Sequence, residues 1–193
     1  MTHPDFMHRR FFTKQELLAY ANLTLFEDQA SLFSAPPILT FDRIVNVEHN
    51  DSRGRIVAEQ DQSAEQSTDP WRPSIFGVDA IWQLLGFYLA LRGAPGSGIP
   101  LGCKEISCIG QIRPHHACLR YEMNVRQVSQ FRQSGAFVAT GDGAILSGSE
   151  SIYSVREAQV AVFPAIQKDS SASSSHRSST PRLQADGVHH ALA

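Results

Sequence analysis

The sequence predicts an α+β fold in which a curved antiparallel β-sheet wraps around one long buried central helix. Three observations predict it: residues 75–91 form an apolar run of helical length, strand-like segments precede and follow that run, and turn residues separate those segments. A helix that is apolar on nearly every face belongs inside a protein. Runs of strands around a single helix form an α+β domain.

The predicted buried helix covers residues 75–91. Apolar residues fall on nearly every face of a 3.6-residue period, and the glycine-containing segment 93–98 follows it. Asp79, Gln83 and Gly86 interrupt the run. It is therefore too short and too polar to cross a bilayer.

Strands are predicted from β-branched residues and alternating hydrophobicity. Pro36-Pro37 forces an extended backbone before the first strand, and residues 50–54 have the composition of a turn. The predicted strands cover residues 38–47, 55–60, 101–112, 119–130, 136–146 and 151–163.

A short helix is predicted to begin after Thr13. The Thr13 side chain is placed to cap the backbone N–H of Glu16, and the Glu16 carboxylate can reach back to Thr13. Phe12 and Leu17 have the spacing of a hydrophobic staple across this helix start. We interpret this helix as a stabilising element with no chemical role.

The length of 193 residues fits one domain with tails. We expect a single domain over residues 1–165, which includes the N-terminal helix. Residues 166–193 are rich in Ser, Gln, His and Arg and have too little apolar content to fold, so we expect a disordered tail.

Charge and cysteine content narrow the function classes. The formal net charge of -2 gives no electrostatic reason to expect nucleic acid or a membrane surface as partner. The chain has three cysteines, Cys103, Cys108 and Cys118, an odd number without CxxC spacing. This pattern disfavours a disulfide framework and fits a reducing compartment. No apolar segment follows the N-terminal arginines as it would in a signal peptide. We therefore expect a cytoplasmic protein.

Asp79 is the singular residue of the apolar helix. A carboxylate there is costly to bury unless something stabilises it, and the N–H groups at a helix N-terminus do so in part. Two interpretations follow from the residues alone: a helix-dipole residue that points to solvent, or a buried catalytic acid or base.

Residues 77–89 (GVDAIWQLLGFYL) closely resemble the central-helix signature G-L-D-A-M-W-Q-L-V-G-F-Y-L of the bacterial 3-hydroxydecanoyl-ACP dehydratase/isomerase family of type II fatty acid synthesis. The resemblance extends over roughly residues 12–163. Flanking segments that agree are Phe12 to Leu18, Asp42 to Val45, Leu101-Gly102, and Gly110 to Ile112 followed by Pro114.

The resemblance implies a dimeric hotdog fold and a 3-hydroxyacyl thioester substrate carried on acyl carrier protein. In this family a His removes the α-proton and an acidic residue on the central helix handles the hydroxyl group. The acidic residue corresponds to Asp79. The resemblance implies neither an organic cofactor nor a metal, and the adjacent pair His115-His116 has poor geometry for chelating one metal ion.

The family's His does not carry over to this chain. The family pattern H-F-x-G-D-P-x-x-P-G places its His fourteen residues before the acid, and Asp69-Pro70 and Pro73 fix the register. The His position is then Glu65. A glutamate has an ordinary pKa of about 4.3 against about 6.5 for histidine. Burial and a neighbouring carboxylate raise such a pKa, which would let Glu65 act as a base.

The remaining candidate residues are assigned to substrate binding. Ser74 replaces a glycine where the family places a backbone N–H against the thioester carbonyl, and a serine can still supply that N–H. We also expect Gly77, Trp82 and Gln83 of the helix motif to line the substrate site.

Two classes of function remain open. In the first, Glu65 and Asp79 act on an acyl-ACP thioester by dehydration, double-bond isomerisation or, less favoured, thioester hydrolysis. In the second, the chain is a catalytically impaired subunit that binds acyl chains or pairs with a His-bearing paralogue. A homodimer and a heterodimer are both open, and loss of the His suggests specialised polyketide or lipid assembly.

Overall fold

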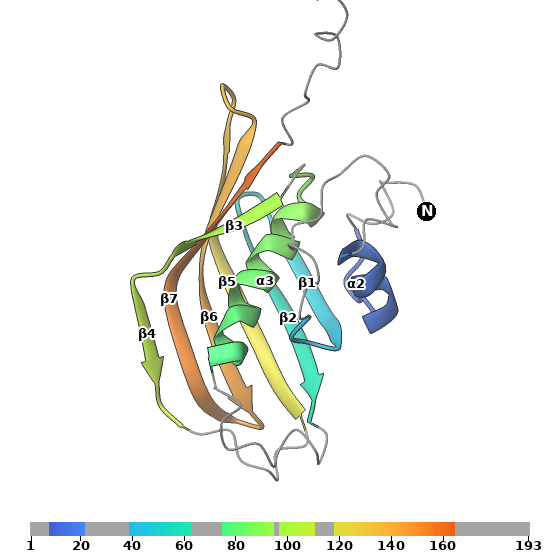
Figure 1. Ribbon diagram of the computed structural model, residues 1–193, viewed down its shortest axis with the longest axis vertical. Coiled ribbons are helices and arrows are strands. Elements are labelled where there is room, and N and C mark those ends of the chain that lie inside the picture. The colour runs from blue at the N-terminus through green and yellow to red at the C-terminus, as the bar shows by residue number, and fades with distance from the viewer. Residues whose placement is uncertain (1–7, 22–38, 63–74, 95–96, 111–117, 165–193) are drawn as a thin grey trace, which may run out of the picture.

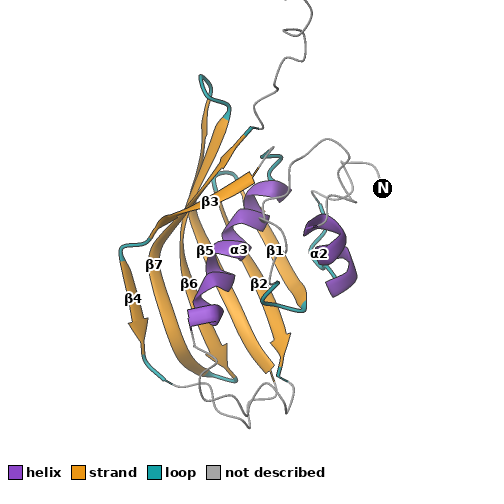
Figure 2. Ribbon diagram, in the orientation of Figure 1, coloured by secondary structure: helices purple, strands orange, loops and turns teal. Residues whose placement is uncertain are grey.

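The computed structural model describes residues 8–21, 39–62, 75–94, 97–110 and 118–164. The elements follow one another as α2 (Lys14–Ala21), β1 (Arg43–Asn50), β2 (Arg53–Asp61), α3 (Ile75–Leu91), β3 (Ser97–Gly102), β4 (Glu105–Cys108), β5 (Cys118–Phe131), β6 (Ala136–Ser147) and β7 (Glu150–Phe163). Figure 1 shows them in chain order by colour, and Figure 2 separates helices from strands.

The seven strands form one antiparallel sheet in the order β1-β2-β5-β6-β7-β3. Strand β4 also pairs with β7, at Tyr153 to Arg156, whereas β3 pairs with β7 at Gln159 to Phe163. β3 and β4 therefore share one edge of the sheet, and β1 forms the other (Figure 1).

Helix α3 packs on one face of the sheet. It contacts β2, β3, β5, β6 and β7, and Figures 1 and 2 show it crossing in front of the strands. Its buried side chains include Ile81, Leu84, Leu85 and Tyr88, each 0% exposed. The predicted bounds of this helix and its apolar surface on nearly every side are confirmed, because burial against five strands leaves few positions open to water.

The edge strand differs from the prediction. We expected one strand over residues 101–112, but the structure divides this stretch into β3 and β4. Gly102 between them has a φ of 129°, and the β3 register shifts between Pro100 and Gly102. The partner strand β7 has its own irregular residue at Glu157, with a φ of 52°. Glu157 lies between the part of β7 that pairs with β4 and the part that pairs with β3, so the two short strands meet β7 on either side of its irregular residue, which the edge sequence alone does not reveal.

The predicted helix start at Thr13 is confirmed. Glu16 Oε2 accepts hydrogen bonds from the Thr13 backbone N–H (2.9 Å) and from Thr13 Oγ1 (2.8 Å), while the Glu16 N–H donates to Thr13 Oγ1 (3.4 Å). Phe12 and Leu17 are 0% and 1% exposed. Helix α2 therefore begins with a capping box and a hydrophobic staple.

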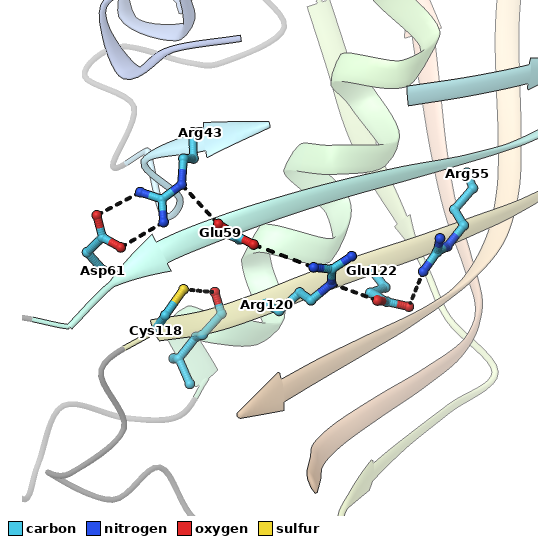
Figure 3. Close-up of polar contacts among 8 residues, drawn as sticks. Arg43, Arg55, Glu59, Asp61, Cys118, Arg120 and Glu122 are labelled. Atoms are coloured by element: carbon cyan, nitrogen blue, oxygen red, sulfur yellow. Dashed lines mark hydrogen bonds and ion pairs between the residues drawn. The ribbon is translucent and has the colours of Figure 1, made fainter. Parts of the chain in front are cut away.

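Charged side chains form an alternating chain across β1, β2 and β5 (Figure 3). Each neighbour in the chain makes an ion pair with the next, in the order Asp61, Arg43, Glu59, Arg120, Glu122 and Arg55. In β5 these charges alternate with the buried Tyr121 and Met123. Because successive strand residues face opposite sides, the chain of charges lies on the face of the sheet away from the core.

Several expectations fall on parts of the chain that the structure leaves undescribed. The extended backbone predicted at Pro36-Pro37, the segment 166–193 and the His115-His116 pair lie outside the described residues. Within the described residues, neither helix is long and apolar enough to span a membrane. No group of three His, Cys, Asp or Glu side chains there is placed to hold a metal ion.

Candidate functional site

Asp79 and Gln83 form a hydrogen-bonded pair in the first half of helix α3. They are four residues apart and therefore lie on the same side of the helix. Gln83 Nε2 donates to Asp79 Oδ2 over 2.7 Å. Asp79 is exposed in the single chain, whereas Gln83 is only 9% exposed. Asp79 is therefore not buried in the single chain, and its role as a catalytic acid or base stays a prediction.

The orientation of the Gln83 amide is fixed from its other side. The backbone N–H of Thr40 donates to Gln83 Oε1 over 3.2 Å, and Thr40 is 8% exposed. A backbone N–H can only donate, so the amide oxygen must face Thr40 and the NH2 group must face Asp79. A short relay thus runs from the segment before β1, through the helix, to the carboxylate.

This relay distinguishes the two oxygens of Asp79. Oδ2 accepts from Gln83 and acts as an acceptor only. No described residue donates a hydrogen bond to Oδ1. The arrangement holds one carboxyl oxygen in place and leaves the other available to a ligand, which is a geometry suited to proton transfer.

Trp82 connects the same helical turn to the edge strand. Its Nε1 donates to the Gly102 carbonyl oxygen over 3.4 Å, and its half-buried ring packs against the core. We predicted a substrate-binding role for Trp82, and this role stays a prediction. The observed contact is structural, because it connects the turn of α3 that follows Asp79 to the end of β3.

The structure places the other predicted site residues unequally. Gly77 lies in the first turn of α3. Glu65 and Ser74 lie outside the described residues. The described site therefore joins Asp79 to Gln83, and the pairing of Asp79 with Glu65 stays a prediction.

Sequence reasoning missed Thr40. A signal for it existed, because a glutamine inside an otherwise apolar helix must find polar partners when it is buried. That signal predicts a partner without identifying it. Thr40 is 43 residues away in the chain, so only the fold brings the two groups together.

The open edge formed by β3 and β4 carries apolar side chains. Ile99, Leu101 and Ile106 are 50%, 52% and 49% exposed. In the described part of the sheet, this edge pairs with β7 on one side only. An unpaired strand edge with exposed apolar residues is a surface that favours association with another chain.

Residues 33–156 match the model of the FabA-like domain, which is more than half of the chain. The chain belongs to the FabA-like domain family. Its antiparallel sheet packed against α3 is the hotdog arrangement of that family. The match covers every described element from β1 to β6 and the first half of β7.

Solved structures with related folds include a dehydratase heterocomplex from Xenorhabdus doucetiae, which is 17% identical and covers 68% of this chain and 86% of that chain with a TM-score of 0.48. The protein AziG of S. sahachiroi is 10% identical over 62% of this chain and 90% of its own, with a TM-score of 0.43. A mutant thioesterase from Pseudomonas aeruginosa is 11% identical over 62% of this chain and 81% of its own, with a TM-score of 0.43. Likeness at this level assigns no activity to the FabA-like chain described here.

Proposed function

We propose that this FabA-like chain is a carbon–oxygen lyase of the dehydratase/isomerase type that dehydrates 3-hydroxyacyl thioesters carried on acyl carrier protein. The observation that carries the proposal is the Asp79 carboxylate, which is exposed on α3 and fixed through Gln83. Such a group is needed to protonate a leaving hydroxyl group.

The proposed reaction uses two carboxyl groups. The Glu65 carboxylate takes the α-proton, and the electron pair of that C–H bond forms the carbon–carbon double bond. The C3–O bond breaks as Asp79 Oδ1 gives its proton to the hydroxyl group, and water leaves. Glu65 ends protonated and Asp79 ionised, so proton exchange with solvent restores both groups. No metal or organic cofactor enters this scheme, and the assignment of Glu65 rests on the family resemblance.

The open edge of β3 and β4 supports dimer formation. Exposed Ile99, Leu101 and Ile106 would be covered by a second chain, and burial of apolar surface favours association by roughly 25 cal/mol per Å². We propose that the working form is a dimer. Either a second copy of this chain or a His-bearing paralogue fits this edge.

The exposure of Asp79 also favours a second candidate function. A carboxylate that opens outward from one chain can complete a site whose base belongs to another chain. In that case this chain lends Asp79 to a His-bearing paralogue and shows no dehydration alone. Lyase activity that appears only on mixing the two chains, and disappears with Asp79→Asn, would identify this function.

The test is mass spectrometry of 3-hydroxyacyl-ACP substrates of several chain lengths after incubation with the purified protein. We expect loss of one water from the carrier-bound acyl group, and we expect Asp79→Asn and Glu65→Gln to abolish it. Asp51→Asn is a matched control, because Asp51 is an exposed aspartate with a φ of 46°, a backbone conformation that asparagine also tolerates. No mass change at any chain length contradicts the lyase acting alone. Release of a free acid instead would indicate a thioesterase that uses Glu65.

A further inference from the structure

A second polar region lies at the far end of α3, around the turn between β1 and β2. Tyr88 Oη donates to the Arg53 carbonyl oxygen over 2.9 Å, and Arg92 Nη2 donates to the Asp51 carbonyl oxygen over 2.6 Å. The rings of His49 and Tyr88 have centroids 5.1 Å apart. The end of the helix therefore holds the turn and places the Arg92 guanidinium beside it.

The segment before α2 approaches the same place. Phe12 and Ile44 form an antiparallel bridge, with hydrogen bonds of 3.0 Å and 2.9 Å between their backbones. Residues before Phe12 consequently run toward the C-terminal end of β1, where His49 lies. Arg10 and His8 are exposed residues of this segment. The segment before α2, the end of α3 and the β1–β2 turn therefore lie at the same end of the molecule, and each carries basic side chains.

The charged groups that shift the pKa of His49 are all positive. Burial lowers the pKa of His49, and the nearby Arg92, His8 and Arg10 lower it further. No carboxylate contributes to this shift. The neighbouring carboxylate of Glu48 accepts a hydrogen bond from Asn46 over 2.7 Å, and Asp51 contributes its backbone carbonyl to Arg92. We call His8, Arg10, His49 and Arg92 the basic cluster.

The basic cluster is unusual within this chain. Most lysines and arginines of the described residues form ion pairs with Asp or Glu. Within the same described ranges, Arg10, Arg53, Arg92 and Arg132 form none, and the first three belong to this end of the molecule. The chain has a formal net charge of -2, so general basicity does not account for the cluster.

The geometry points to the basic cluster as a binding site for a dianionic phosphate group, either free phosphate or a soluble phosphate monoester. Guanidinium groups present planar donors that match phosphate oxygens. Arg92 donates one N–H group to the Asp51 carbonyl oxygen, and its other N–H groups can donate to a ligand. Arg92 lies beside the β1–β2 turn, and Arg10 belongs to the segment that runs toward the same end of β1, so two guanidinium groups without ion pairs among the described residues lie at one end of the molecule.

The site is separate from the proposed lyase site. Asp79 and Arg92 are thirteen residues apart, which corresponds to about 20 Å along a helix. A bound dianion would raise the pKa of His49 by offsetting the surrounding positive charge. By linkage, the anion binds more tightly when His49 is protonated, so affinity rises as the pH falls below 6.5 toward the lowered pKa of His49.

The test combines calorimetry with NMR of the His49 imidazole, assigned with His49→Asn. Inorganic phosphate and glycerol phosphate are titrated at about pH 7 and constant ionic strength. Sulfate, which stays a dianion, is titrated at about pH 5 and about pH 8, so that the protein and not the ligand changes its protonation. We expect both phosphate probes to shift the His49 resonance, and sulfate to bind at least about threefold more tightly at the lower pH.

Variants locate the site. Arg10→Gln and Arg92→Gln should each weaken phosphate binding about tenfold, a free-energy loss of about 1.4 kcal/mol. Arg132→Gln, a matched control at another arginine without an ion pair among the described residues, should leave binding unchanged. Arg10 is exposed, so its variant is expected to fold normally.

Three results would overturn the proposal. Equal binding by Arg10→Gln and Arg132→Gln would place the anion elsewhere. A His49 shift that sodium chloride reproduces at matched ionic strength would indicate charge screening only. Binding to vesicles that contain phosphatidic acid, with no binding of the soluble phosphates, would assign the cluster to a lipid surface instead.

Discussion

The two ends of helix α3 use polar groups in opposite ways. Near its start, Gln83 is satisfied by Thr40 and holds an exposed carboxylate in place. Near its end, Tyr88 and Arg92 donate to backbone carbonyls and hold the β1–β2 turn. One apolar helix can therefore have three roles. Its middle packs in the core, one end positions a carboxylate, and the other end holds a turn by hydrogen bonds.

The largest expected effect is on activity at the Asp79 end. Asp79→Asn removes the proton donor but keeps the shape of the side chain. Removal of a positioned general acid costs roughly 10²- to 10⁴-fold in rate. The melting temperature should stay within one or two degrees of wild type, because Asp79 is exposed. A variant that keeps at least a tenth of the wild-type kcat would show that Asp79 is not the acid.

A large stability effect is expected at the turn end. A Cβ at Gly54 would lie 2.1 Å from Tyr88 Oη and 2.3 Å from the Glu48 carbonyl oxygen. Gly54→Ala should therefore destabilise the fold by about 3 kcal/mol or more, since overpacking of a fixed site costs this much. Urea unfolding measures it. The double variant Gly54→Ala/Tyr88→Phe should recover little, because the Glu48 backbone still blocks the methyl group.

Gln83 tests whether the Asp79 end is also structural. Gln83→Leu leaves the buried Thr40 N–H without its acceptor, at a cost of about 1–3 kcal/mol of unfolding free energy. It also releases the Asp79 carboxylate, so kcat should fall about tenfold or more while the unfolding cost stays modest. Gln83→Glu is the informative companion, because its carboxylate can accept from Thr40 but has no N–H group to donate to Asp79 Oδ2. Activity restored fully by Gln83→Glu would contradict the proposed relay.

The Tyr88 hydroxyl gives a smaller effect. Tyr88→Phe removes the hydrogen bond to the Arg53 carbonyl while leaving the ring in the core. We expect a loss of about 1 kcal/mol in unfolding free energy and an unchanged lyase rate. A change in rate with no change in stability would join the two ends of the helix functionally, which the geometry does not predict.

The smallest effect concerns pH at the turn end. Burial first, and then Arg92, His8 and Arg10, lower the pKa of His49 below 6.5 in the folded chain. The unfolded chain therefore binds the proton more readily, so stability falls as the pH drops below 6.5 toward the lower folded pKa, and no effect arises above 6.5. His49→Asn should flatten this part of the pH dependence in thermal unfolding. An equal slope in the variant would assign the dependence to other groups.

The sequence predicted best where the physical signal is local. The bounds of α3 follow from an apolar run that no other element of the chain resembles. The capping box at Thr13 and Glu16 follows from residues three apart. Local patterns of this kind need no knowledge of the fold to be recognised.

The sequence could not predict features that depend on distant segments. The division of the edge into β3 and β4 coincides with the irregular backbone of β7 at Glu157. The partner of Gln83 is Thr40, and the basic cluster draws on the segment before α2, on β1 and on the end of α3. The resemblance identified Asp79, but its exposure and its single held oxygen emerge only when the segment before β1 packs against the helix.

The most direct test of the account is the reverse reaction in water labelled with heavy oxygen. A 2-enoyl-ACP is incubated with wild-type protein and with Asp79→Asn, and the acyl-ACP and any free acid are analysed by mass spectrometry. The account predicts labelled oxygen on the carrier-bound 3-hydroxyacyl product with wild type and none with the variant. Label found only in a released carboxylic acid, or label incorporated equally by Asp79→Asn, would contradict it.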